Sequence, residues 1–76
     1  MLENPHVRSQ HIATSIAKDG TTTTKLVIET NAEAIESNFE ELVEAVVEYI
    51  NARDDLECAE INCRKTVVST AMPRSP

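Results

Sequence analysis

Glutamate is the residue of this chain with most capacity for chemistry, and four glutamates recur at every fourth position. They are Glu36, Glu40, Glu44 and Glu48, with Glu33 and Glu41 close by. Each four-residue step along a helix advances about 6 Å and turns about 40°, so the carboxylates would form a slowly winding row on one flank. No Lys or Arg stands four residues from any of the four to offset their mutual repulsion. The spacing therefore predicts an acidic face on a helix.

An acidic helix face fits two roles. In the first, the carboxylates only solvate the surface, which is the usual role of a run of like charge. In the second, they bind a basic surface on a partner protein, because clustered charge of one sign steers association and selects register. The expected partner-binding residues are Glu33, Glu36, Glu40, Glu41, Glu44 and Glu48.

A sharper form of the binding hypothesis follows from the spacing of the carboxylates. A repeat of about 6 Å resembles, in spacing and sign, the phosphates along one nucleic-acid strand. Small acidic inhibitors of restriction, CRISPR or transcription machinery occupy nucleic-acid-binding grooves in this way. We therefore expect a non-enzymatic inhibitor or modulator of the phage anti-defence or host-takeover type, whose partner is a basic, nucleic-acid-handling protein.

Catalysis and metal binding are not expected from the remaining polar residues. The single glycine, Gly20, excludes a glycine-rich phosphate loop, and glutamates on a solvated flank lack the desolvation that separates an acid from a base. Cys58 and Cys63 would lie on opposite faces of one strand, about 17 Å apart, too far for a disulfide. Their spacing also lacks the paired pattern of a zinc site, so we expect no cofactor and no metal.

Charge divides the chain into two parts. Residues 29–60 hold eleven of the thirteen acidic residues and one base, Arg53, for a net charge of −10, and the rest carries +4. The overall charge of −6 argues against direct binding to nucleic acid or to an anionic membrane. With no apolar run of about 20 residues and no signal-peptide pattern, we expect a cytoplasmic protein.

Residues 7–30 predict a β-hairpin with its turn at 18–20. A two-residue loop would pair Ile12 with Val27 and divide the large aliphatic side chains between the two faces. A three-residue loop would pair Ile12 with Leu26 and gather them on one face. We favour the three-residue loop, because a slip of one residue moves every side chain to the other face.

Residues 31–53 predict one long amphipathic helix, with Thr30 or Asn31 as its cap and no Gly or Pro to interrupt it. Its apolar stripe spans about 100°, the width of a core-facing surface. The stripe consists of Ile35, Phe39, Leu42, Val43, Val46 and Ile50. Residues 56–69 alternate as a third strand.

These elements predict a single α+β domain over residues 7–69, with a flexible N-terminus at 1–6 and a disordered tail at 70–76. The order is β-β-α-β, and the simplest arrangement is a three-stranded mixed sheet in the order 2-1-3, with the long helix on one face. The other face would be uncovered.

That uncovered face and the sheet edges carry the alternative function. A structural homodimer could form through the sheet, with contacts at Val27, Arg64 and Lys65, while the acidic helix face is only solvated. The same two bases could instead protect the edges from pairing with another chain.

Overall fold

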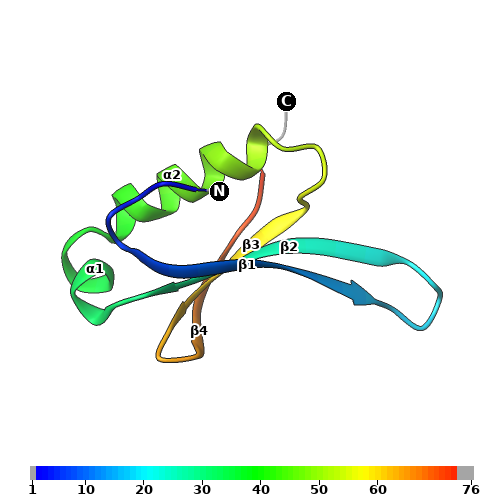
Figure 1. Ribbon diagram of the computed structural model, residues 1–76, viewed down its shortest axis with the longest axis horizontal. Coiled ribbons are helices and arrows are strands. Elements are labelled where there is room, and N and C mark those ends of the chain that lie inside the picture. The colour runs from blue at the N-terminus through cyan, green and yellow to red at the C-terminus, as the bar shows by residue number, and fades with distance from the viewer. Residues whose placement is uncertain (1, 74–76) are drawn as a thin grey trace.

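Residues 2–73 are described by a computed structural model, which shows a four-stranded sheet and two helices, the longer of which lies over one face of the sheet (Figure 1). The elements are β1 (Val7–Ile16), β2 (Thr22–Thr30), α1 (Ala32–Ser37), α2 (Phe39–Asn51), β3 (Cys58–Cys63) and β4 (Thr66–Ala71). The strands lie in the order β1-β2-β3-β4. β2 and β3 are parallel, and the other neighbours are antiparallel. The α+β composition is as predicted, but the sheet is not.

The expected three-stranded sheet with strand order 2-1-3 is wrong, because β2 is an inner strand and β1 an edge strand. β2 pairs with β3 in parallel from Lys25 opposite Cys58 onward. The physical reason lies in the side chains of β2. Leu26 and Ile28 are fully buried, whereas β1 has no fully buried residue. An inner strand has a neighbouring strand on each side and the helix over one face, so this position buries the apolar side chains of β2 better than an edge position would.

The stretch 56–69, expected as one strand, contains a second hairpin. β3 and β4 are joined by a two-residue turn at Arg64 and Lys65, both with positive φ, 54° and 65°. Turns of this kind usually carry Asn-Gly, so an Arg-Lys pair gave no turn signal. β4 continues to Ala71, which is buried, so the first two residues of the expected tail are strand. Residues 74–76 of that tail lie outside the described part of the chain.

The single helix expected over 31–53 is also wrong, because the chain leaves helical geometry at Asn38 (φ −136°, ψ 22°). The Asn31 side chain caps α1, as predicted, accepting from the Ala34 N–H at 2.8 Å. The Asn38 N–H then donates to the Ala34 carbonyl, and the Asn38 carbonyl accepts from Leu42 N–H, so one residue ends α1 and begins α2. Ser-Asn is a weak helix-forming pair whose side chains compete for backbone groups.

The first hairpin has the predicted three-residue loop. Ile12 lies opposite Leu26 and Ile16 opposite Thr22, and Gly20 has the positive φ of 87° that the turn requires. The loop end of this hairpin, which we call the arm, projects beyond the rest of the sheet (Figure 1). Ile12 and Ile16 therefore remain 41% and 75% exposed although they are on the helix-facing side.

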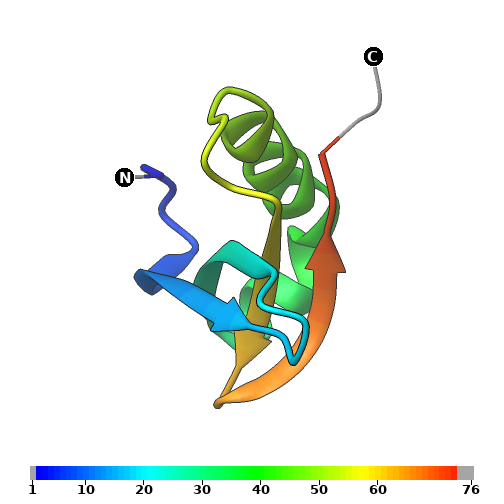
Figure 2. The same cartoon turned by 90° about the vertical axis from the view of Figure 1, so that its right-hand side faces the viewer.

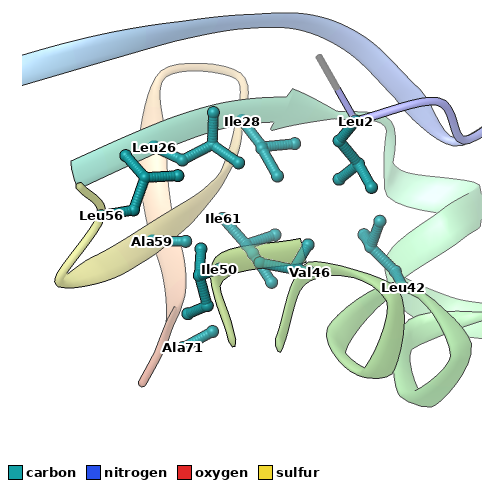
Figure 3. Packing of buried hydrophobic residues seen from close by; sticks show 10 residues of the cluster. All are labelled: Leu2, Leu26, Ile28, Leu42, Val46, Ile50, Leu56, Ala59, Ile61 and Ala71. Carbon is teal, nitrogen blue, oxygen red and sulfur yellow. The ribbon is translucent and has the colours of Figure 1, made fainter. Parts of the chain in front are cut away.

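The core lies between α2 and the sheet (Figure 3). Its buried apolar side chains are Leu2, Leu26, Ile28, Leu42, Val46, Ile50, Leu56, Ala59, Ile61 and Ala71. Leu2 is held there by two hydrogen bonds to Gln10, from Leu2 N–H to Oε1 (3.0 Å) and from Nε2 to the Leu2 carbonyl (2.7 Å). The segment 1–6, expected to be flexible, thus supplies a core residue from its second position.

Candidate functional site

The acidic helix surface consists of the six predicted glutamates on α1 and α2. Glu33, Glu36, Glu40, Glu41, Glu44 and Glu48 are all exposed. Their orientation follows from the apolar stripe on the other side of α2, where Leu42, Val46 and Ile50 are buried against the sheet. Burial of that stripe turns the intervening carboxylates toward solvent.

The break at Asn38 changes the shape of this surface. The predicted continuous row is wrong, because α1 and α2 run in different directions (Figure 1). A shallow hollow on α2 is lined by Glu40, Glu41, Glu44 and Glu48. A second hollow, across the break, brings Glu36 beside Glu40 and Glu41. Glu33 lines neither hollow, so the structure gathers five of the six carboxylates.

Most of these carboxylates are not held by another side chain in the described part of the protein. Within residues 2–73, no hydrogen bond or ion pair involves the side chains of Glu33, Glu36, Glu40, Glu41 and Glu48. Glu44 differs from the other five, because it has an interaction partner. Five carboxylates are therefore left to interact with solvent or with a partner.

The one base of the acidic segment, Arg53, is already engaged. Its guanidinium donates to both Asp55 carboxylate oxygens, at 2.9 and 2.7 Å, and to the Tyr49 hydroxyl at 2.7 Å. It also lies over the Tyr49 ring, 5.6 Å from the centroid. The hydrogen bonds from Arg53 hold the pKa of Asp55 below its ordinary value. Arg53 is thus bound at the end of α2 and makes no hydrogen bond to the glutamates.

A second candidate site lies on the opposite, open face of the sheet. This basic hollow has a volume of about 650 Å³ and is lined by Arg8, Ser9, His11, Val27, Glu29, Asn62, Arg64 and Lys65. It brings together the three predicted sheet contacts, Val27, Arg64 and Lys65. However, the sequence predicted the two bases along a strand, and the structure places them in the β3–β4 turn.

The sequence reasoning missed Arg8 and Asn62 as members of this site. The structure also places His11 and Val27, two lining residues, opposite each other on β1 and β2. Bringing Arg8 near Arg64 requires β1, β2 and β3 to be neighbours. The alternation of polar and apolar side chains along a single strand does not indicate the order of the strands in the sheet.

The two cysteines lie at opposite ends of β3. Both are free and partly exposed. Cys58 is opposite Lys25, and Cys63 is opposite Thr30, which is buried on the helix side. The predicted placement on opposite faces is confirmed. Within the described residues, no group of three or more His, Cys, Asp or Glu side chains could hold a metal ion.

No helix within residues 2–73 has the length and apolar character needed to cross a membrane. No family model, curated protein or solved structure matches this chain.

Proposed function

We propose that this protein acts by binding, with the acidic helix surface docked on a basic surface of a nucleic-acid-handling protein. The observation that carries the proposal is the set of five exposed carboxylates that form no hydrogen bond or ion pair within residues 2–73. They stand on helices that pack against the core, so the backbone positions that carry them are set before binding. Side chains on an ordered backbone cost less conformational entropy on association than side chains on a flexible loop.

The energetics favour a partner of opposite charge. Glutamates four residues apart on α2 repel each other by a few tenths of a kcal/mol in an isolated helix. A basic partner would convert this repulsion into attraction and would raise the association rate at low salt. Direct nucleic-acid binding is disfavoured by the same charge, because phosphates repel carboxylates.

The proposed consequence of binding is inhibition. A partner groove that accommodates phosphates also accommodates carboxylates, so the docked protein would exclude nucleic acid from it. This is the mode of action of an inhibitor of the phage anti-defence or host-takeover type. The partners to test are accordingly basic proteins that bind DNA or RNA.

The test compares two pairs of substitutions with the same change in charge. Glu40→Gln with Glu48→Gln alters the acidic helix surface. Glu3→Gln with Asp54→Asn alters two exposed acids elsewhere. Purified nucleic-acid-binding proteins are first screened for binding to the natural protein at low salt. For each binder, the Kd is then measured for both pairs.

The surface pair should raise the Kd at least tenfold, and the control pair less than twofold. The natural protein should also compete with labelled DNA or RNA for the partner, and the surface pair should lose this competition. Equal effects of the two pairs would mean that only net charge matters, and the proposal would fail.

A second candidate function is a homodimer through the sheet. The observation in its favour is β4, an edge strand on which Val67 and Val68 are 53% and 42% exposed. Unpaired strand edges with apolar side chains invite pairing with another chain. Sedimentation of the natural protein and of Val68→Lys tests this: a dimer that dissociates on substitution supports it, and a monomer at all concentrations excludes it.

A further inference from the structure

The twist of the sheet makes the basic hollow on its open face concave. The strong twist of the sheet sets β1 and β4 at a steep angle to each other (Figure 2). The hollow lies near the end of the sheet where β1 begins and the β3–β4 turn lies. Its volume of about 650 Å³ is within the range of small-molecule sites.

Three cations approach the hollow from two sides. Arg8 comes from β1, and Arg64 and Lys65 come from the β3–β4 turn. β1 and β3 are two strand spacings apart, about 10 Å, a gap that two long arginine side chains reaching inward can close around one anion. No hydrogen bond or ion pair within residues 2–73 involves the side chains of these three residues.

Glu29 is the one acid that lines the hollow, and its role there is structural. Its Oε1 accepts a hydrogen bond from the Lys65 backbone N–H at 3.1 Å. With three bases and one acid, the lining has a net charge of +2 when His11 is neutral. A positively charged hollow in a protein of charge −6 indicates a specific anionic ligand rather than a general attraction.

The conformation of the turn supports a functional reading of its two bases. Arg64 and Lys65 both adopt positive φ, 54° and 65°, a region that residues with a Cβ disfavour. Asn-Gly is the pair that such turns usually carry. Strained residues of this kind concentrate at ligand-binding sites. Two cations held in this conformation, with side chains lining a hollow, therefore point to a binding role.

Asn62 supplies an unused polar group in the same hollow. Its Oδ1 is buried and has no hydrogen-bond partner within the described residues. Buried polar atoms are nearly always paired, so this amide stands out. Rotation of the amide exchanges its donor and acceptor ends. A buried, unpaired amide oxygen on a residue that lines the hollow is an observation independent of the charge of the lining.

We propose that the basic hollow binds the phosphate group of a small phosphate monoester. Arginine side chains present paired N–H donors that match phosphate oxygens, and Lys65 adds a third charge. The lining contains no Phe, Tyr or Trp and one imidazole, that of His11, so a single strand of nucleic acid would lack the row of stacking platforms that such ligands use. The proposal concerns the face opposite the acidic helix surface and does not depend on it.

Titration followed by backbone amide NMR tests the proposal. The probes are ribose 5-phosphate, inorganic phosphate and ribose, at constant ionic strength. Both phosphates should give saturable shifts at Asn62, Arg64 and Lys65, and ribose should give none. Arg8→Gln with Arg64→Gln should weaken binding of ribose 5-phosphate at least tenfold. Lys18→Gln with Lys25→Gln, which removes two charges elsewhere, should weaken it less than twofold.

A second variant guards against an effect on folding. Arg64→Asn with Lys65→Gly suits the turn and removes two of the three cations, so it should keep a native spectrum and lose binding. Three outcomes would overturn the proposal: shifts that do not saturate, equal weakening by the control pair, or undiminished binding in the turn variant.

Discussion

Glu29 and Lys65 are joined across the sheet, with the Lys65 backbone N–H donating to Glu29 Oε1 at 3.1 Å. Glu29 lies on β2, and Lys65 is the second residue of the turn that connects β3 to β4. The bond therefore ties an inner strand to a turn whose two residues adopt positive φ. A hydrogen bond to a charged acceptor is stronger than a neutral one, and here it offsets part of the backbone strain.

The first prediction concerns that strain. Arg64→Asn with Lys65→Gly should raise the free energy of unfolding by roughly 1–2 kcal/mol, because Asn and Gly adopt positive φ more readily. Glu29→Ala should lower it by about 1–2 kcal/mol, since the Lys65 N–H loses its acceptor. Urea unfolding followed by circular dichroism measures both. A destabilised turn variant would show that the turn is not strained.

The second prediction separates burial from side-chain type. Ile61 is fully buried, and Ile16 is 75% exposed on the projecting arm. Ile61→Val should lower the free energy of unfolding by about 0.5–1.5 kcal/mol, because it removes a buried methylene and leaves space behind. Ile16→Val removes the same group and should change it by less than about 0.5 kcal/mol. Similar losses from both would mean that the arm is covered in solution.

The third prediction concerns the acid limb of the stability profile. The hydrogen bond from the Thr21 backbone N–H to Asp19 Oδ1, at 2.9 Å, lowers the pKa of Asp19. A lowered pKa in the folded state stabilises the fold above the pKa of the unfolded chain, near 3.8. This contribution is lost as the pH falls through the lower, folded value.

Asp19→Asn removes the titrating group and keeps an acceptor in the turn. Its free energy of unfolding should therefore fall less steeply between pH 5 and about 2 than that of the natural protein. Thermal unfolding at several pH values measures the slope. Lys18→Gln, next to it in the same loop, serves as the control and should leave the acid limb unchanged. A steeper slope for Asp19→Asn would contradict the assignment.

Local patterns in the sequence determined part of the fold. The register of the first hairpin follows from Ile12 and Leu26, which must share a face, and from Gly20, which permits the turn. The helical stripe follows from spacing alone, and Leu42 and Val46 are buried as expected. In each of these cases the decisive residues lie close together in the chain.

The rest of the fold could not be predicted in this way, because the residues concerned fit two local conformations about equally well. Asn38 could continue a helix or interrupt it, and only its tertiary position decides between the two. Arg64 and Lys65 could extend a strand or form a turn, and their types favour neither. Strand order depends on which strand is best buried, which no single strand reveals. The acidic surface was predictable because it lies on one segment, whereas the basic hollow draws on three strands and a turn.

The last prediction uses the polarity of α2 itself, which carries acids in its first turn and no base in its last. Glu48→Lys places a positive charge at the C-terminal end, where the helix dipole favours it, and four residues after Glu44, an orientation that attracts. Glu41→Lys makes the same change in charge at the N-terminal end, where the dipole opposes it. Glu48→Lys should therefore be more stable than Glu41→Lys by roughly 1 kcal/mol, measured by urea unfolding at low salt, and the difference should shrink at 1 M salt. Equal stabilities at low salt would mean that the glutamates of α2 do not experience the dipole. If both substitutions also weaken binding to the partner strongly, the acidic helix surface favours binding at a cost to the stability of α2.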